Sequence, residues 1–331
     1  MNIYVDGMGG DHSPDEIVKG CVLAVNELKK NITIIGDEKA ISEQLSKYNY
    51  SSEMIEIIPS SEVISNNEDP TRAIRKKKES SLVLGMKKIK EEKDSIFVSA
   101  GSTGALLAGG LLLVGRIKGI QRPALTIPLP TKKGYTILLD AGANVDCKPT
   151  YLQQFAIMSN IYAKNILDIN NPRIGLINIG SEEKKGNELT KETYKLLKET
   201  DINFVGNIEA RDIPEGNADI LVCDGFTGNI ILKLSEGLGG FIFDALKEAI
   251  TASTRAKLGG LLLKPSLKKF KNRFDYKEVG GAPLLGINGG IIKAHGSSDS
   301  KAIFSAIKQG ILFQEKNILN EISNKIIEIN D

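Results

Sequence analysis

The chain has 331 residues, 41% hydrophobic and 25% charged, with a formal net charge of +2 at pH 7. This composition is typical of a globular protein with a sizeable core, and the small net charge excludes nucleic-acid binding driven by charge alone. Three widely spaced cysteines predict a reducing compartment and neither a disulfide framework nor a zinc site. No apolar run approaches the roughly 18 residues of a membrane-spanning helix, and a strand-like run follows Met1 where a signal peptide would stand. We therefore expect a cytoplasmic protein.

Strand-like apolar runs alternate with amphipathic helical stretches from the first residues onward. Residues 3–5, 32–35 and 54–58 are predicted strands, and residues 15–30 and 38–47 are predicted helices. This alternation is typical of an α/β fold in which helices cover a mostly parallel sheet. Ligands bind such sheets at the carboxyl ends of the strands, so the loops after the predicted strands are the candidate site.

One strand-to-helix junction has the features of an anion-binding site. The apolar run 96–98 leads to Gly101, Ser102, Thr103 and Gly104, and an Ala/Leu-rich helical stretch follows. The free N–H groups of a first helical turn and the helix dipole favour an anion, and glycines let a ligand approach the backbone. An ordinary helix start capped by Ser or Thr is the alternative.

Similar polar loops follow other predicted strands. The loop after residues 3–5 contains Asp11 and His12, which either belong to the site or only shape a tight turn. The loops after the predicted strands 135–139, 173–178 and 219–223 contain Asn144, Ser181, Lys184, Asp224 and Asn229. Their recurrence predicts a cleft lined with small polar groups and backbone donors.

A predicted β-hairpin leads into the last polar loop. Asn288-Gly-Gly lies between two short apolar runs, which is typical of a tight hairpin turn. The following loop contains His295, either a site residue or a loop histidine satisfied by its neighbours. A single long helix is predicted after it, from about residue 299 to residue 328.

Two segments concentrate positive charge. The first is a helix-like stretch with Pro70 near its start, and its basic residues are Arg72, Arg75, Lys76, Lys77 and Lys78. It is either a solvated helix face or a docking site for an acidic partner.

The second basic segment, residues 250–279, is predicted to form a protruding amphipathic helical hairpin. No acidic residue occurs between Glu248 and Asp275. The apolar side chains of the segment are Leu261, Leu262, Leu263, Leu267, Phe270 and Phe274. A basic amphipathic helix beside an apolar tip is typical of contact with an anionic membrane surface. A dimer arm that packs on its twin is the alternative, and both can hold.

Seven motifs together resemble one family. In chain order they are GMGGDHSP, EDPTRAIRKKKESS, SAGSTGA, LDAGAN, NIGSE, CDGFTGN and GGAPLLGINGG followed by KAHGSS. The combination resembles the bacterial phosphate acyltransferases, the PlsX family, from the first predicted strand to the last helix. Gly7, where alanine is expected, and Ser102, where asparagine is frequent, depart from the family pattern.

The resemblance implies a three-layer α/β/α, Rossmann-like fold similar to the isocitrate and isopropylmalate dehydrogenases, with residues 1–331 as one catalytic domain and no cofactor. It implies transfer of a fatty acyl group from acyl-[acyl-carrier-protein] to inorganic phosphate. The acyl phosphate would feed a membrane glycerol-3-phosphate acyltransferase at the start of phospholipid synthesis. The family forms homodimers, and the basic hairpin adds peripheral contact with the membrane.

The candidate residues suit this chemistry. Phosphate is already an anionic nucleophile, so the site needs donors that position it and stabilise the oxyanion, and the chain has no GxSxG nucleophile elbow. We assign phosphate to Gly101, Ser102, Thr103, Gly104, Ser181 and Lys184. We assign the thioester to Asn144, Asn229 and His295, with Asp11, His12 and Asp224 organising these donors. The basic stretch 72–78 would meet the acidic carrier protein, and no metal site is predicted.

Three other functions stay open from the sequence. A phosphotransacetylase that uses acyl-CoA has the nearest chemistry. A decarboxylating dehydrogenase would need grouped acidic metal ligands, and the nearest pair is split, because Asp219 begins a predicted strand whereas Asp224 follows it. A non-catalytic membrane scaffold would leave the polar strand-end loops without a role.

Overall fold

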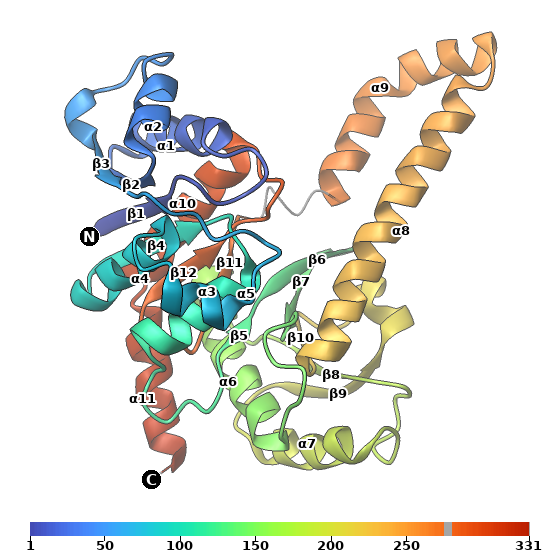
Figure 1. Ribbon diagram of the computed structural model, residues 1–331. Coiled ribbons are helices and arrows are strands. Elements are labelled where there is room, and N and C mark those ends of the chain that lie inside the picture. Colours follow the sequence, from blue (N-terminus) through green and yellow to red (C-terminus); the bar gives the residue numbers. More distant parts are fainter. Residues whose placement is uncertain (275–279, 331) are drawn as a thin grey trace.

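The computed structural model describes residues 1–274 and 280–330, whose strands form two sheets (Figure 1). In spatial order, the first sheet contains β3 (Ile55–Pro59), β2 (Ile32–Gly36), β1 (Asn2–Asp6), β4 (Ser95–Ser99), β12 (Gly290–Lys293), β11 (Ala282–Leu285) and β5 (Ala124–Leu125). The strands from β3 to β12 are parallel, and β11 is antiparallel to β12 and β5. The hairpin predicted around Asn288 is therefore confirmed as β11–β12.

The second sheet is smaller and also mostly parallel. In spatial order it contains β6 (Ile127–Thr131), β7 (Gly134–Leu139), β10 (Ile220–Val222), β8 (Ile174–Asn178) and β9 (Phe204–Glu209). Only the β6–β7 pair is antiparallel among the described strands of this sheet. The predicted α/β class is confirmed, and the division of the strands between two sheets is a feature that the local pattern did not predict.

The central strands are buried on both faces. Every residue of β4 and of β8 is buried, as continuous apolar runs in parallel sheets require. Along β4, Ile96 and Val98 enter one apolar cluster while Phe97 enters another. These two clusters lie on opposite faces of the sheet, because successive side chains of a strand alternate, and together they give the three-layer arrangement.

Helices cover both faces of the first sheet. On one face α1 (Asp15–Leu28) packs on α10 (Ser300–Glu315), which contacts β4 and β12. The approach is close because Gly20 has no side chain, and a Cβ there would lie 2.6 Å from Ile303 Cβ. On the other face α4 (Ser81–Glu91) contacts β1, β2 and β4, and α3 (Pro70–Lys76) packs on α5 (Thr103–Gly109). The helix α2 (Glu38–Leu45) packs beside α1 and β3.

The second sheet shares its core with the first. The helix α6 (Pro149–Ile166) contacts β7, β10, α7 (Glu188–Glu199) and α11 (Ile318–Asn330). One apolar cluster contains Val98 of the first sheet, Met158 of α6 and Val222 of the second sheet. A 3-10 helix (Ala210–Glu215) lies between β9 and β10 in the chain and contacts β6.

The prediction of one long C-terminal helix is wrong. The structure has two helices, because α10 ends at Glu315 and α11 begins at Ile318. Asn317, between them, has a left-handed backbone with φ of 53°. Asparagine adopts this conformation more readily than most residues, and it ends the regular helix there.

The helices α8 (Gly225–Thr251) and α9 (Thr254–Phe274) form an arm that extends away from both sheets (Figure 1). They approach closely at Gly260, where a Cβ would lie 2.2 Å from Ile250 Cγ2. The sequence predicted the hairpin at residues 250–279, whereas its first helix starts at Gly225 and residues 275–279 lie outside the described residues. None of the described helices is both long and apolar enough to cross a membrane.

Candidate active site

The carboxyl ends of strands from both sheets meet at a cavity of about 380 Å³. Its walls include residues that follow β1, β4 and β12 of the first sheet and β7 and β10 of the second. The predicted site residues that line it are Asp11, Gly101, Thr103, Gly104, Asn229 and His295. The strand-end loops therefore converge on a space of the size that a small substrate needs.

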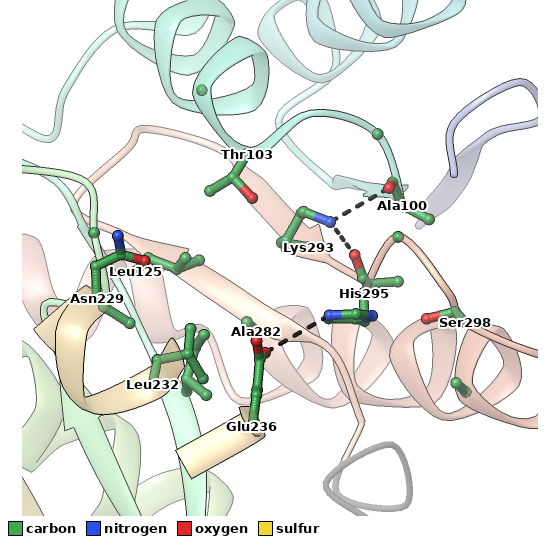
Figure 2. A pocket seen from close by; sticks show the side chains of 18 of the residues that line it. Ala100, Thr103, Leu125, Asn229, Leu232, Glu236, Ala282, Lys293, His295 and Ser298 are labelled. Carbon is green, nitrogen blue, oxygen red and sulfur yellow. Dashed lines mark hydrogen bonds and ion pairs between the residues drawn. The ribbon is translucent and has the colours of Figure 1, made fainter. Parts of the chain in front are cut away.

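The helix α8 forms one wall of this cavity (Figure 2). Its lining residues recur at the spacing of one helix face and are Asn229, Leu232, Lys233 and Glu236. Asp224 caps this helix, since its carboxylate accepts hydrogen bonds from the Thr227 N–H at 2.8 Å and the Thr227 hydroxyl at 2.9 Å. Asp224 thus fixes the start of the helix that presents Asn229.

Hydrogen bonds that begin at a buried carboxylate stabilise the loop after β4, and the sequence analysis did not single out this carboxylate. Asp6 accepts a hydrogen bond from Ser99 Oγ at 2.7 Å, and Ser99 Oγ accepts one from the Gly101 N–H at 3.0 Å. Ser102 caps α5 through a 3.4 Å hydrogen bond from the Ala105 N–H to its Oγ. Thr103 instead presents its side chain to the cavity (Figure 2).

His295 lies opposite the α8 wall. Its Nδ1 accepts a hydrogen bond from the Ser297 N–H at 3.2 Å, so the neutral ring carries its proton on Nε2. That nitrogen lies 3.7 Å from Glu236 Oε1 (Figure 2). The Asp11 N–H donates to the Gly296 carbonyl at 2.8 Å, which joins the loops after β1 and β12.

Lys293 is a cavity residue that the sequence analysis missed. It ends β12, and its Nζ donates to the carbonyl oxygens of Ala100, at 3.3 Å, and Ala294 (Figure 2). Burial lowers the pKa of Lys293 to about 8, although the carboxylates of Asp6 and Asp11 oppose this shift. The available signal was a lysine that directly follows the apolar run 290–292, at the carboxyl end of a predicted strand.

Asn144 is engaged in the loop after β7. Its Nδ2 donates to the Pro123 carbonyl at 2.7 Å and to Asp140 Oδ2 at 2.8 Å. The buried Asp140 carboxylate also accepts hydrogen bonds from backbone N–H groups of residues 125, 143 and 144. Desolvation raises the pKa of Asp140 against these hydrogen bonds. The loop so fixed places Gly142 in the cavity wall, where a Cβ would lie 3.4 Å from Asn229 Cβ.

Three other predicted residues lie apart from the cavity. His12 is exposed, and its carbonyl accepts a hydrogen bond from the Glu16 N–H near the start of α1. Ser181 and Lys184 are exposed in the loop after β8. Within one chain, the structure does not bring Ser181 and Lys184 together with the loop after β4.

The basic stretch 72–78 lies close in the fold to the loop after β4. Arg72, Arg75, Lys76 and Lys78 are exposed on or just after α3. Lys77 is half-buried, with its Nζ 2.8 Å from Glu68 Oε1. The helix α3 packs on α5, and a Cβ at Gly104 would lie 2.8 Å from Pro70 Cγ. The helix with these exposed cations therefore packs beside α5, whose first residues line the cavity.

The arm exposes the predicted membrane-contact leucines. Leu261, Leu262 and Leu263 of α9 are exposed, and Leu267 is partly buried. The side chains of Phe270 and Phe274 lie outside the described residues.

The structure also bears on nucleophiles and metal ligands. Burial raises the pKa of the Cys21, Cys147 and Cys223 thiols, that of Cys147 to about 12. Among the described residues, no group of three or more His, Cys, Asp and Glu side chains could hold a metal ion.

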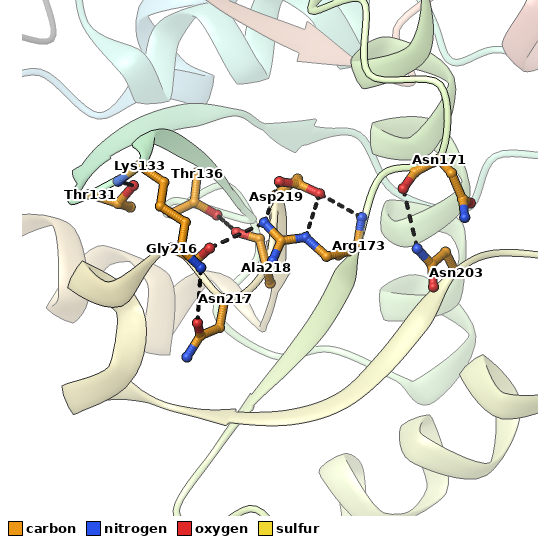
Figure 3. Close-up of polar contacts among 10 residues, drawn as sticks. All are labelled: Thr131, Lys133, Thr136, Asn171, Arg173, Asn203, Gly216, Asn217, Ala218 and Asp219. Carbon is orange, nitrogen blue, oxygen red and sulfur yellow. Dashed lines mark hydrogen bonds and ion pairs between the residues drawn. The ribbon is translucent and has the colours of Figure 1, made fainter.

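Asp219 lies at the opposite end of β10 from Asp224, as the sequence predicted. It pairs there with Arg173, whose Nη2 is 2.8 Å from Asp219 Oδ1 (Figure 3). Burial acts to raise the pKa of Asp219, but the hydrogen bonds and charge of Arg173 lower it. This carboxylate is a structural partner of Arg173 and is not part of the cavity.

Comparisons with known proteins show the family and the fold of the chain. A family model described as "Fatty acid synthesis protein" matches residues 1–321. Phosphate acyltransferases of Clostridium novyi (strain NT) and Alkaliphilus oremlandii (strain OhILAs) are 56% and 54% identical, over 98% and 100% of this chain and 98% and 99% of their own. A phosphotransacetylase structure from Streptococcus pyogenes covers 99% of this chain and 94% of its own, with a TM-score of 0.63 and 17% identity, and so shares the fold. The chain belongs to the phosphate acyltransferase (PlsX) family.

Proposed function

We propose that this phosphate acyltransferase takes its fatty acyl group from acyl-[acyl-carrier-protein] and releases an acyl phosphate for phospholipid synthesis. The observation that carries the proposal is one cavity lined by both polar and apolar groups. The polar groups include Thr103 and the glycine loop, and the apolar side chains are Leu107, Leu125, Ile127 and Leu232. The polar groups suit phosphate, and the apolar side chains suit the start of a fatty acyl chain.

Phosphate is held, in this proposal, by the loop from Gly101 to Gly104. The network from Asp6 through Ser99 to the Gly101 N–H fixes this loop before substrate arrives, so little ordering is needed when the anion binds. Asn229 and His295 enter from opposite walls (Figure 2). A thioester placed between them would meet two donors for the oxyanion that forms when phosphate attacks.

Phosphate attacks the thioester directly in this proposal. The raised pKa of each cysteine thiol keeps it protonated near neutral pH, and a thiol is a poor nucleophile compared with its thiolate. The leaving thiol of the carrier resembles a free cysteine, with a pKa of about 8.5, and departs with little acid assistance.

The exposed cations of α3 would dock the acidic carrier protein. Their helix packs on α5, which begins in the loop after β4, so a carrier bound there would have its thioester near the cavity. Attraction between opposite charges steers such encounters, and this attraction weakens as the salt concentration rises. Arg75→Glu with Lys76→Glu should raise the carrier-protein KM several-fold at low salt and leave the phosphate KM unchanged.

We also propose that two copies pair through the arm and that its tip contacts an anionic membrane. Along α8 the exposed apolar side chains recur on one stripe and are Phe226, Ile230, Leu234, Leu238 and Phe241. A monomer rarely exposes so long an apolar surface. Contact with a bilayer would release the acyl phosphate, an amphiphile, near a membrane glycerol-3-phosphate acyltransferase, while the body of the protein stays in the cytoplasm.

The proposed reaction is tested by thiol release from palmitoyl-carrier protein with and without inorganic phosphate. We expect release only with phosphate, and a much lower kcat/KM with palmitoyl-CoA or acetyl-CoA. Mass spectrometry after mixing with the acyl carrier alone should show no acyl adduct on the enzyme. Preference for acetyl-CoA would support a phosphotransacetylase instead, and a stoichiometric adduct would exclude direct attack.

A further inference from the structure

We propose that Lys293 is the cation that receives inorganic phosphate in the cavity. The inference rests on the proposed function, because it assigns the cation for that reaction's nucleophile. The lysines that line the cavity, within the described residues, are Lys233 and Lys293. Lys233 is exposed and already paired with Glu236, at 2.8 Å from Nζ to Oε2. Lys293 makes no ion pair in the described part of the chain, so its positive charge is available to a ligand.

The position of Lys293 is fixed by the backbone. Its Nζ donates to the carbonyl oxygens of Ala100 and Ala294, one on each of two adjacent strand-end loops. An ammonium has three N–H donors, so two carbonyl partners leave one donor for a ligand. Figure 2 shows this ammonium between Thr103 and the His295 loop, inside the cavity.

A built-in charge at this point suits an anion that must be held against a second substrate. Lys293 pairs in register with Ser99 across β12 and β4, so it stands beside the loop from Gly101 to Gly104. Phosphate oxygens there would meet the ammonium and the Thr103 hydroxyl together. A hydrogen bond to a charged group in a water-poor site is stronger than a neutral one.

The groups that face Lys293 determine when it is charged. Burial lowers its pKa to about 8 and Lys233 acts in the same direction, whereas Asp6 and Asp11 raise it. Glu236 and His295 line the same cavity. The free protein therefore loses the Lys293 charge as pH rises through about 8, and phosphate affinity should fall over that interval.

The test compares Lys293→Met and Lys293→Arg with Lys308→Met, which removes an exposed charge from the far part of α10. Lys293→Met should raise the phosphate KM roughly 10- to 100-fold, the range for a hydrogen bond to a charged group, and change the carrier-protein KM less than twofold. Lys293→Arg should retain part of the affinity and keep it above pH 8, because a guanidinium stays protonated. Lys308→Met should match the wild-type chain.

A second readout does not depend on catalysis. Inorganic phosphate should raise the Tm of the wild-type chain and of Lys308→Met, but not of Lys293→Met, because a bound ligand stabilises the folded state. A Lys293→Met protein that keeps the wild-type phosphate KM or Tm response would overturn the inference, as would a wild-type Tm that phosphate does not change. If no acyl carrier supports thiol release, the proposed function fails, while the Tm response still decides the role of Lys293.

Discussion

The inner and outer halves of α8 face opposite environments although they form one continuous helix. In the inner half, Gly225, Gly228 and Leu232 are buried, and Asn229 and Glu236 line the cavity. In the outer half, no described residue is buried, and most polar and apolar residues alike are exposed. Leu238 and Phe241 are 52% and 69% exposed, and nothing lies within 4 Å of a Cβ built at Gly237.

This contrast distinguishes the part of α8 that borders the proposed active site from the part that exposes a surface for another molecule. On one face, the inner half has polar side chains toward the cavity and small residues against the loop after β7, so these contacts are explained within one chain. On another face, Phe226 and Ile230 begin the exposed apolar stripe. The outer half places large apolar side chains where water would be, and a single chain does not account for them. The same helix therefore links the proposed site with a surface that another copy or a bilayer would cover.

The largest effect is expected when a glycine is replaced by alanine in the inner half of α8, and the same replacement in the outer half is the comparison. A Cβ at Gly228 would lie 1.9 Å from the Asp140 carbonyl oxygen, and that backbone is fixed by the hydrogen bonds of the Asp140 carboxylate. Gly228→Ala should therefore lower the free energy of unfolding by about 3 kcal/mol. Gly237→Ala should raise it by up to about 1 kcal/mol, because alanine favours a helix. Urea unfolding measures both, and destabilisation by Gly237→Ala would indicate that a second copy packs tightly there.

The second prediction concerns the polar face of the inner half. Asn229→Ala should lower kcat by about 10²-fold, the usual loss of one oxyanion donor, with little change in stability. Ser235→Ala, on the same helix, exposed and outside both the cavity lining and the apolar stripe, is the matched control and should keep kcat. If both variants have wild-type kcat in the acyl-carrier assay, α8 supplies a wall and no donor.

Much of this architecture could be predicted from local sequence pattern. The helix predicted at residues 15–30 is α1, and the strand predicted at 173–178 is β8, because the local sequence determines long periodic or uniformly apolar stretches. The strand β9 was missed, since Gly206, with φ of 94°, interrupts its apolar pattern. The hairpin was predicted to begin at residue 250, whereas the arm begins with α8 at Gly225, because the local sequence does not show whether a helix packs on the sheets or extends away from them.

The sequence predicted which loops carry polar residues, but not which of those loops the order of strands brings together. The loops after β8 and β4 look alike in sequence. In the second sheet, however, β10 and β7 lie between β8 and the edge strand β6. Ser181 and Lys184 are therefore apart from the cavity, a consequence of strand order that no local motif records. Lys293 was missed for a related reason, because its partner Ala100 is distant in sequence and close only in the folded chain.

The third prediction tests the outer half as a dimer surface. Leu238→Glu with Phe241→Glu places two charges on the exposed stripe and should weaken self-association at least tenfold, because each apolar side chain contributes about 1.5–3 kcal/mol when fully buried. Sedimentation velocity over a concentration series measures this. Lys247→Glu, on the same helix, is the control for charge. A double variant that associates like the wild-type chain would place the dimer contact elsewhere.

The last prediction tests whether the exposed leucines of α9 serve membrane contact and neither catalysis nor dimer formation. Leu261, Leu262 and Leu263 are 66%, 83% and 54% exposed, and Arg255, Lys257 and Lys264 share their helix. Leucine burial favours insertion at the headgroup boundary, and each basic residue adds up to about 1 kcal/mol near an anionic leaflet. Part of this is lost because the helix is only partly immersed, so binding should be moderate and should weaken with salt.

We therefore expect flotation with phosphatidylglycerol vesicles and little with phosphatidylcholine vesicles. Leu261→Glu with Leu263→Glu should abolish flotation, whereas acyl transfer in solution and the dimer should stay unchanged, because these side chains lie far along the arm from the cavity that α8 borders. Lys308→Met is the control for an unrelated surface change. If the double variant instead loses its dimer, the tip is part of the assembly surface, and the exposed leucines of α9 are covered by a second copy and not by lipid.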